Sequence, residues 1–289
     1  MTDVELVVDC RCELGEGPVW HEQEMALYWV NINGFEQHRF DPESGEHQVE
    51  NFDQHVTAVV PREKGGFVMS MRDGFALTDG FGPPAEMVAQ VEKETNTRFN
   101  DGKADPAGRF IAGTMGFDAA LGAGALYRFD TDYSVTRLLD GVSISNGLAW
   151  SADGSTLYYI DTLSFQVEAF DYDLETGDLS NRRQAIEFGR DTGYPDGMSI
   201  DEEGFLWVAF WGGSAVRRFS TEGKLDREIK LPVPNVSSCA FGGPDLSDLY
   251  ITTAYEGLSP DLREAHPTSG SLYRASPGVR GGRAYRFKG

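Results

Sequence analysis

A polar turn followed by a short apolar strand recurs six times along this 289-residue chain, and this repeat limits the fold more than any other feature. Successive turns begin 41 to 49 residues apart, and each leads into a short apolar and aromatic run typical of a β-strand. The six turn-and-strand units begin at His21, Arg62, Asp105, Ala152, Asp201 and Gly243. Repeats of about 40–50 residues made of short strands are typical of propeller blades. The sequence therefore predicts an all-β fold, a six-bladed β-propeller in which residues 1–289 form a single domain.

A second short strand follows most of these units and ends in a turn rich in Asp and Gly, as in residues 38–45 and 169–177. A solenoid of parallel coils is the alternative fold for a repeating chain. Solenoid coils have shorter repeats, however, and the hairpin-type turns found here favour antiparallel blades.

The chain is strongly acidic, with 46 Asp and Glu against 25 Lys and Arg and a net charge of −21. Such a surface repels nucleic acid and acidic membranes, so we expect neither as a partner. No apolar run of 18 or more residues is present, and the first residues lack the basic and apolar regions of a signal peptide. We therefore expect a cytoplasmic protein. The composition carries no signal for an oligomeric state.

The three cysteines, Cys10, Cys12 and Cys239, are an odd number in a long chain. This argues against a disulfide framework and for a reducing compartment. No second Cys or His pair lies near Cys10-x-Cys12 in the sequence, and the five histidines show no metal-ligand spacing. Any metal is therefore expected to bind through oxygen ligands.

One polar residue of each repeat is expected at the same mouth of the central channel, because the innermost strand of every propeller blade lines that channel. Stepping back eight residues from the glycine of the polar turn reaches Asn100, Asn146 and Asp196, and the matching position in the first repeat is Glu16. The two remaining repeats align more loosely. The predicted ring consists of Glu16, Thr57, Asn100, Asn146, Asp196 and Ser238.

Every position of this predicted ring carries a side-chain oxygen, and four of the six are followed closely by glycine. Glycine permits close backbone approach, which suits a crowded ring around an axis. Two carboxylates with amide oxygens between them form a site for a hard divalent cation. The alternative is that these residues only cap strand starts and hydrogen-bond to loops. The shared register in four repeats favours the cation site.

Several motifs resemble the gluconolactonase family, which includes regucalcin (senescence marker protein) and the luciferin-regenerating enzymes. The most specific are RFNDGK at residues 98–103, SNGL at 145–148 and PDGM at 195–198, in this order. Further matching segments are GEGPVW (15–20), GTM (113–115), residues 157–177, SNRR (180–183) and residues 241–252. Together they extend over almost the whole chain. The family fold is a six-bladed propeller, which agrees with the repeat count.

The resemblance implies that Glu16, Asn146 and Asp196 are the three protein ligands of a catalytic divalent metal. Asp196 also matches the residue that has the acid/base role in the family. Oxygen ligands admit calcium, magnesium, manganese, zinc or iron. The implied activity is hydrolysis of a small-molecule sugar lactone, an aldonolactone, to the aldonic acid.

The resemblance further implies that Arg98 and Asn100 contact the substrate and that Asp118, in the loop after Met115, is an additional acidic contact. This loop is shorter and richer in Gly and Ala than in the animal members, so the resemblance does not define the lid or the choice of substrate. Arg98 would steady the oxyanion or the sugar hydroxyls. The alternative for Arg98 is an ion pair at the surface of an acidic protein.

Three other functions remain compatible with the sequence. One is a non-enzymatic calcium-binding or regulatory protein, and another is a metal-dependent esterase or phosphotriesterase. The third is a protein-interaction propeller, which would need exposed apolar patches that this acidic composition does not favour. A covalent serine mechanism is disfavoured because the chain has no GxSxG motif.

Overall fold

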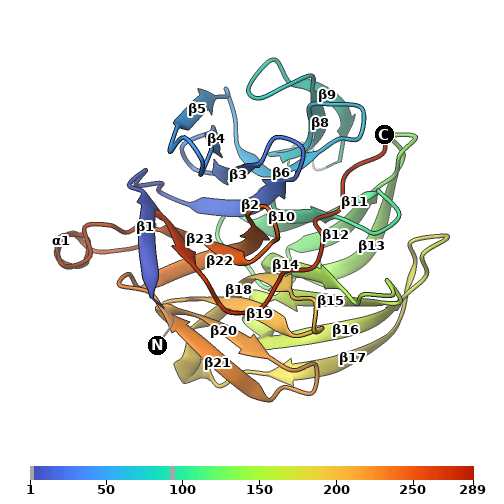
Figure 1. Cartoon of the computed structure of the whole chain (residues 1–289). Coiled ribbons are helices and arrows are strands. Elements are labelled where there is room, and N and C mark those ends of the chain that lie inside the picture. Colours follow the sequence, from blue (N-terminus) through green and yellow to red (C-terminus); the bar gives the residue numbers. More distant parts are fainter. Residues whose placement is uncertain (1–2, 92–94) are drawn as a thin grey trace.

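Six antiparallel sheets of four strands each surround a central axis in the computed structural model, which describes residues 3–91 and 95–289 (Figure 1). This arrangement confirms the predicted all-β, six-bladed propeller. Each of five blades is one uninterrupted stretch of chain, and its strands pair in sequence order. Blade 1 contains β2 to β5, and the numbering continues around the ring to blade 6.

Each blade has four strands that follow one another from the axis outward. The innermost strands are β2 (Gly15–His21), β6 (Val56–Pro61), β10 (Thr97–Ala104), β14 (Ser145–Trp150), β18 (Tyr194–Ile200) and β22 (Asn235–Gly242). The second strands are β3 (Ala26–Asn31), β7 (Phe67–Met71), β11 (Phe110–Gly116), β15 (Thr156–Asp161), β19 (Leu206–Trp211) and β23 (Asp248–Ala254). The third strands are β4 (Glu36–Phe40), β8 (Gly74–Thr78), β12 (Gly124–Phe129), β16 (Gln166–Tyr172), β20 (Ala215–Phe219) and β24 (Leu272–Ala275). The outermost strands are β5 (His47–Asn51), β9 (Glu86–Gln90), β13 (Val135–Val142), β17 (Leu179–Glu187), β21 (Leu225–Lys230) and β1 (Val4–Val8).

In the part of the chain that the structure describes, three short helices lie in the connections, namely η1 (Thr162–Ser164), η2 (Arg190–Thr192) and α1 (Pro260–Ala265). Within residues 3–91 and 95–289, no helix has the length and apolar character needed to span a bilayer.

The turn glycines that aligned the repeats occupy a backbone region open mainly to glycine. Gly108, Gly154 and Gly204 have φ values of +89°, +71° and +82°. Each closes the turn between the first and second strands of its blade. The same backbone requirement therefore recurs in successive blades, which is why glycine marks the repeat in the sequence.

The core consists of apolar layers between neighbouring blades. Strand β6 is buried at all six positions, whereas the outermost strand β5 is mainly exposed. One layer joins blades 2 and 3 through the Phe75 and Phe129 rings, which stack with centroids 4.6 Å apart. Burial on both faces of the inner strands explains their continuous apolar runs.

The ring of blades is closed by pairing the two ends of the chain. Strand β1 pairs antiparallel with β24, with Val4 opposite Ala275 and Val8 opposite Leu272, and completes blade 6. The first strand of the chain is thereby built into the last blade, which ties the two ends of the chain together.

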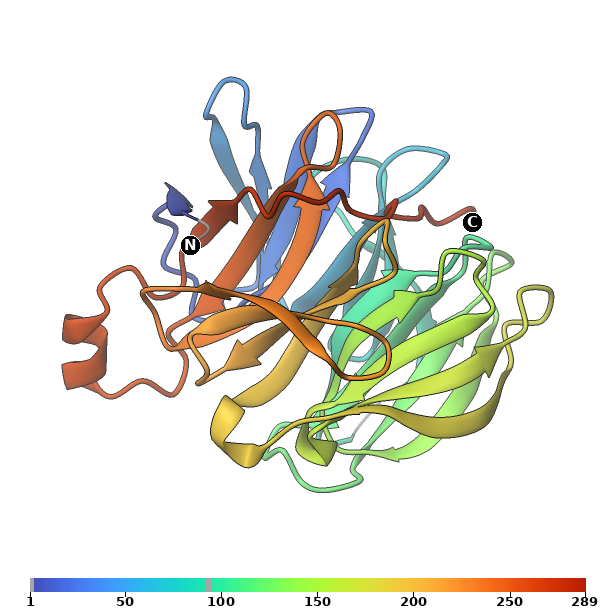
Figure 2. The same ribbon diagram turned by 60° about the horizontal axis from the view of Figure 1, so that its bottom comes forward.

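The last residues of the chain cross one mouth of the channel (Figures 1 and 2). This C-terminal strap, residues 276–289, contacts blade 5 where the Gly282 N–H donates to the Ile200 carbonyl at 3.0 Å. It reaches blade 2 where the Phe287 N–H donates to the Pro61 carbonyl at 3.0 Å. The Phe287 side chain is fully buried and stacks on Phe129, with centroids 5.3 Å apart. The strap thus links blades on opposite sides of the ring.

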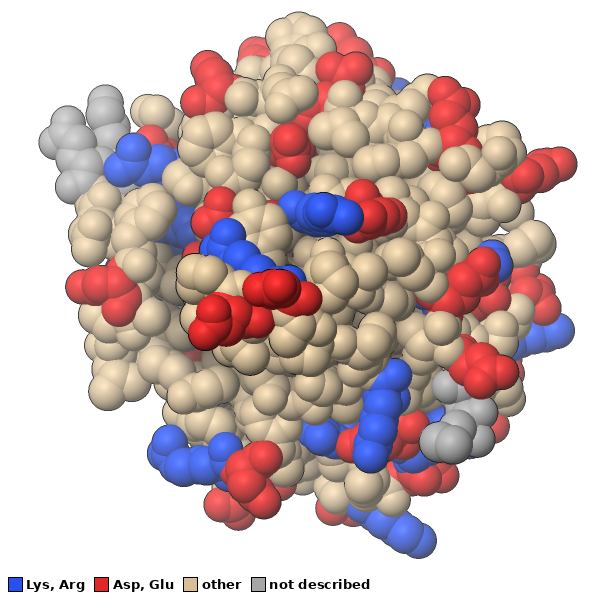
Figure 3. All heavy atoms as spheres, turned by 90° about the vertical axis from the view of Figure 1, so that its left-hand side faces the viewer, with Lys and Arg blue, Asp and Glu red and all other residues tan. Residues whose placement is uncertain are grey.

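Charged side chains of both signs are interspersed on the side of the molecule that Figure 3 shows. Uncharged areas separate them there, so the negative net charge does not form one continuous acidic surface on this side.

We expect Phe287→Ala to lower the free energy of unfolding by about 3–5 kcal/mol, the usual cost of emptying a buried phenylalanine site. Denaturant unfolding measures this difference. Lys288→Ala is the control, because this neighbouring side chain is exposed and its loss should change stability by less than about 0.5 kcal/mol. Equal stability of Phe287→Ala and the wild-type protein would show that the strap does not support the ring.

Candidate metal and active site

Each inner strand changes its pairing register at or next to the predicted ring position. The shift lies between Glu16 and Val19 in β2 and between Phe99 and Gly102 in β10. The corresponding shifts in the other inner strands are Val56/Ala58, Asn146/Leu148, Pro195/Met198 and Val236/Ser238. A bulge inserts an extra residue and re-aims side chains that would otherwise alternate between faces. All six blades therefore depart from regular pairing at the same level of the channel.

Glycines beside the ring allow neighbouring inner strands to come close together. A Cβ added to Gly147 would lie 2.8 Å from the Asp196 carbonyl oxygen, and one added to Gly197 would lie 2.5 Å from the Ser238 Cβ. Both contacts cross from one blade to the next. Only glycine fits these two positions without displacement of the adjacent strand.

A hydrogen-bonded network connects three of the predicted site residues. Arg98 Nη1 donates to Asn100 Oδ1 at 2.6 Å, and Asn100 Nδ2 donates to Asn146 Oδ1 at 3.0 Å. The Asn100 amide also donates to the Ser145 carbonyl at 2.8 Å. The amide of Asn100 is thus held between blades 3 and 4, and its oxygen supports the guanidinium of Arg98.

The orientation of Asn146 is fixed by Thr162 at the start of η1. The Thr162 hydroxyl donates to the Pro195 carbonyl at 2.9 Å, which leaves its oxygen free to accept from Asn146 Nδ2 at 2.8 Å. This assigns the nitrogen of the Asn146 side chain toward Thr162 and its oxygen toward Asn100. The second lone pair of that oxygen can serve a cation.

Two buried carboxylates, one from blade 1 and one from blade 5, face the same space. Glu16 and Asp196 are each about 5% exposed, and the charge of Glu16 disfavours ionisation of Asp196. Burial, followed by the charge of Asp101, raises the pKa of Glu16 to about 8. Burial and the charge of Glu16 raise the pKa of Asp196 well above its ordinary value. Asp196 Oδ1 is buried and has no hydrogen-bond partner among the described residues.

Asp101 adds a third buried carboxylate that the sequence analysis did not place in the ring. Its Oδ1 accepts from the Gly102 N–H at 2.7 Å, and burial raises its pKa while the Lys103 ammonium opposes that rise. Lys103 Nζ donates to the Met198 carbonyl at 2.7 Å. Asp101 directly follows Asn100 in RFNDGK, and the register shift of β10 brings Asn100 and Asp101 into the site. An aspartate next to a ring position was therefore a usable signal.

Arg98 is the buried cation of this group. Burial lowers the pKa of its guanidinium, and the carboxylates of Glu256, Glu16 and Asp196 oppose that change. One guanidinium shared among several carboxylates leaves the site deficient in positive charge. The unpartnered Asp196 oxygen, the Asn146 oxygen and Glu16 are the hard oxygen donors that a divalent cation takes, so these residues fit such an ion.

The two loosely aligned ring positions, Thr57 and Ser238, take no part in the hydrogen-bonded network of Arg98, Asn100 and Asn146. The Thr57 hydroxyl lies 2.8 Å from Ser70 Oγ and also donates to the Ser70 carbonyl at 3.2 Å. In β22 the residue inside the register shift is Ser237, whose hydroxyl donates to the Gly15 carbonyl, and the predicted Ser238 is the next residue. Thr57 and Ser237 thus hold the inner strands rather than offering free oxygens.

Asp118 lies in the loop after β11 and is exposed. Its Oδ1 accepts from the Ala120 N–H at 3.3 Å, within the same loop. None of the hydrogen bonds or ion pairs recorded for the described residues joins it to the ring. Its role as a substrate contact therefore stays a prediction.

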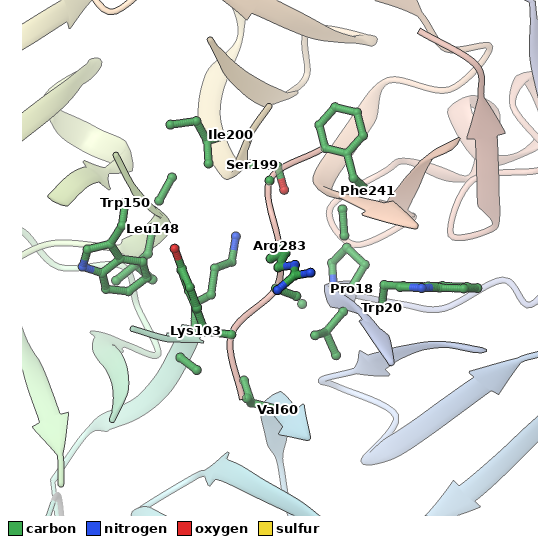
Figure 4. Close-up of a pocket in the computed structure, with 18 of the residues that line it drawn as sticks. Pro18, Trp20, Val60, Lys103, Leu148, Trp150, Ser199, Ile200, Phe241 and Arg283 are labelled. Atoms are coloured by element: carbon green, nitrogen blue, oxygen red, sulfur yellow. The ribbon is translucent and has the colours of Figure 1, made fainter. Parts of the chain in front are cut away.

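A cavity of ≈ 280 Å³ lies in the channel below the ring (Figure 4). Most of its lining residues come from later in the inner strands, such as Trp20, Lys103 and Leu148, and Arg283 of the strap lies across it. Asp101 and Ser238 adjoin both the ring and the cavity. The strap covers the channel on the cavity side.

The fold corrects one sequence inference. Cys10 and Cys12 were expected to lack a histidine partner, yet His38 of β4 lies beside them. The three ligand atoms all lie within 4.8 Å of one another. This grouping has no local signal in the sequence, because two strands, β2 and β3, separate the cysteines from β4 along the chain.

Residues 14–255 match the family described as "SMP-30/Gluconolactonase/LRE-like region". Regucalcins of Danio rerio and Homo sapiens are 44% and 40% identical to the chain, and each alignment covers 99% of this chain and 98% of the relative.

Solved structures agree with the sequence match. A luciferin-regenerating enzyme has a TM-score of 0.92 at 36% identity, with 100% of both chains covered. A calcium-binding protein, regucalcin, from Agrobacterium tumefaciens has a TM-score of 0.94 at 29% identity, covering 99% of this chain and 98% of that one. A gluconolactonase from Xanthomonas campestris shares the fold at 22% identity and a TM-score of 0.77, covering 95% of this chain and 89% of that one. The resemblance expected from the motifs is thereby confirmed, and the chain belongs to the SMP-30/gluconolactonase/LRE-like family.

Proposed function

We propose that this protein is a metal-dependent sugar lactonase that hydrolyses aldonolactones to aldonic acids. The observation that carries the proposal is the buried pair of carboxylates, Glu16 and Asp196, with an Asp196 oxygen that has no partner among the described residues. Membership of a family that includes gluconolactonases supports the same chemistry. A buried, like-charged pair is stable in the ionised state only beside a cation.

Glu16, Asn146 and Asp196 would hold one divalent cation through oxygen atoms. When bound, such a cation supplies Lewis-acid polarisation of a carbonyl and lowers the pKa of a coordinated water. Calcium, magnesium and manganese suit these donors, and zinc and iron are also admitted. The Thr162 hydroxyl would act on this site only through the orientation that it gives Asn146.

Asp196 is the residue placed to move the proton. Its carboxylate would accept a proton from the attacking water as the new carbon–oxygen bond forms. It would return that proton to the ester oxygen of the lactone as the bond between this oxygen and the carbonyl carbon breaks. The products are then one carboxylic acid group and one hydroxyl group.

Arg98 would donate to the developing oxyanion or to the sugar hydroxyls. One of its nitrogens is occupied by Asn100 Oδ1 and the Phe99 carbonyl, at 2.6 and 2.9 Å. These contacts hold the guanidinium plane, and its other donors are available to substrate. Asn100 already uses its amide on Ser145, Asn146 and Arg98, so its contribution is to position its neighbours.

Calcium binding without catalysis is the second candidate function. The specific support is the oxygen-only character of the ring and its likeness to a structure described as a calcium-binding protein. A metal-dependent esterase or phosphotriesterase would use the same residues on another substrate. Rate measurements on lactones, esters and phosphotriesters separate these alternatives.

We expect Asp196→Asn and Glu16→Gln to lower lactone hydrolysis by about 10²–10⁴-fold, because each removes an ionised ligand and the first also removes the base. Acid release from glucono-, galactono- and xylonolactone, with metal-stripped and metal-restored protein, measures the effect. Asp79→Asn, at an exposed carboxylate, is the control and should keep the wild-type rate. Normal hydrolysis by metal-loaded Asp196→Asn would contradict the assignment. Tight metal binding by the wild-type protein without hydrolysis would favour the second candidate.

The stability of the metal-free protein should fall as pH rises from about 4.5 to about 8. In this window the folded protein keeps a proton on Glu16 that the unfolded chain has released. The folded state then binds more protons, so the free energy of unfolding decreases by up to about 1.4 kcal/mol per pH unit for each such group. Urea unfolding in chelator measures it, with Glu16→Gln as the comparison. A stability difference between the two proteins that does not vary with pH would contradict this expectation.

Thr162→Val should weaken divalent-metal binding by about 10–100-fold, the usual effect of losing a contact that orients a ligand. The variant removes the acceptor for Asn146 Nδ2 but keeps the shape of the side chain. Calorimetric titration with Ca²⁺ and Mn²⁺ measures the affinity. Thr176→Val, at an exposed turn, is the matched control. Unchanged affinity in Thr162→Val would mean that Asn146 is oriented by other contacts.

A further inference from the structure

A cluster of thiols and imidazoles lies outside the ring, at the seam between blades 6 and 1. Cys10 and Cys12 belong to the connection between β1 and β2, and His38 belongs to β4. Cys12 Sγ lies 3.5 Å from Cys10 Sγ and 3.7 Å from His38 Nε2. Cys12 and His38 are about 1% and 2% exposed, whereas Cys10 is partly exposed. The proposed lactonase mechanism uses none of these residues.

We propose that Cys10, Cys12 and His38 form a binding site for one zinc ion. Zinc in a tetrahedral site lies about 2.3 Å from sulfur and about 2.0–2.1 Å from nitrogen, which sets sulfur–sulfur and sulfur–nitrogen separations of about 3.8 and 3.5 Å. The distances of 3.5 Å between the two sulfurs and 3.7 Å between Cys12 and His38 are close to these values. The cluster is therefore nearly arranged for the ion.

Glu36 of β4 lies beside the ligating imidazole but is not among the three residues whose ligand atoms all lie within 4.8 Å of one another, so a small movement of the ligands toward the ion would be needed for it to become the fourth ligand. Its Oε2 lies 3.3 Å from His38 Nε2, a separation that suits two neighbouring ligands of one tetrahedral ion. Asn31 Nδ2 donates to the same oxygen at 2.6 Å and holds the carboxylate in place. Two thiolates, one imidazole and one carboxylate are a donor set that zinc accepts.

His47 and Trp29 orient the ligating imidazole. His38 Nδ1 lies 2.9 Å from His47 Nε2, so a proton on Nδ1 leaves Nε2 with its lone pair toward the cysteines. The Trp29 ring stacks against both histidines, with centroids 4.8 Å from His38 and 5.3 Å from His47. A ligating histidine that donates its other ring nitrogen to a fixed partner is the usual second-layer arrangement of zinc sites.

The two metal sites differ in chemistry and in consequence. The ring offers only oxygen atoms, whereas the cluster offers two sulfurs and a nitrogen, which select softer ions. The cluster also touches blade 6, because the Cys12 N–H donates to the Gly270 carbonyl at 2.8 Å and Cys10 Sγ donates to it at 3.3 Å. Zinc at the cluster would fasten the connection between the first and last blades and so stabilise ring closure.

Co²⁺ titration of the reduced, metal-stripped protein tests the proposal, because thiolate ligation gives a charge-transfer absorption that oxygen ligation does not. We expect one equivalent of Co²⁺ to produce this absorption and Zn²⁺ to displace it. The absorption should persist in Glu16→Gln, which removes a ring ligand, and in Cys239→Ser, the matched thiol control remote from the cluster. Cys12→Ser and His38→Gln should each lower the affinity for Zn²⁺ by at least about tenfold.

Thermal unfolding gives a second measurement that does not depend on absorption. In the Glu16→Gln background, which removes a ring ligand, Zn²⁺ should raise the unfolding midpoint of Glu16→Gln and of Glu16→Gln/Cys239→Ser but not that of Glu16→Gln/His38→Gln. If Cys12→Ser does not fold, Cys10→Ser and His38→Gln carry the test. Cobalt binding without thiolate absorption, or equal Zn²⁺ affinity in wild type and His38→Gln, would overturn the proposal. A Cys10–Cys12 disulfide that forms with no uptake of metal by the reduced protein would also overturn it.

Discussion

The convergence of six inner strands on one axis is the constraint on which the rest of this structure depends. Each strand contributes its residues at the same level, so side chains that are distant in sequence, such as Glu16 and Asp196, meet in a small buried space. Regular alternation would send half of them into the blades. The register shifts in every inner strand prevent this, and Gly147 and Gly197 allow the strands to approach closely enough for contact between blades.

Buried carboxylates at the axis have an electrostatic cost that the protein alone does not offset. Arg98 is one cation beside Glu16, Asp196 and Glu256, and it is held by Asn100 rather than by a carboxylate. The raised pKa values of Glu16 and Asp196 measure this imbalance. A cation would remove it, which is why the same residues that destabilise the ionised, metal-free fold are the ones suited to bind metal. The repulsion between these carboxylates therefore lowers the stability of the metal-free protein and favours the binding of a cation.

The sequence predicted those features that the repeat encodes locally. A turn glycine with positive φ marks blades 3, 4 and 5, and a fixed step from it reached Asn100, Asn146 and Asp196. In blade 6 the eight-residue step could not be applied exactly, because no residue in the sequence marks where the bulge of β22 lies. Ser238 was therefore predicted, although Ser237 is the residue inside the register shift. His38 could not be assigned to Cys10 and Cys12, because their proximity arises from packing across a strand pair. Asp118 was named from the family resemblance alone, and its exposed loop has no contact that defines its role.

The proposed zinc cluster and the oxygen ring are connected through the start of blade 1. Glu36 accepts a hydrogen bond from Asn31 Nδ2, and Asn31 Oδ1 accepts from the Leu14 N–H at 3.1 Å. Leu14 precedes Glu16 by two residues and forms a bridge to Ala254 of blade 6. A ligand that fixes Glu36 therefore also restrains the backbone from which Glu16 reaches the axis. The contacts of Leu14, Asn31 and Glu36 thus join blades 1 and 6 and also position the strand that carries Glu16. Closure of the propeller and the geometry of the candidate active site depend on these same contacts.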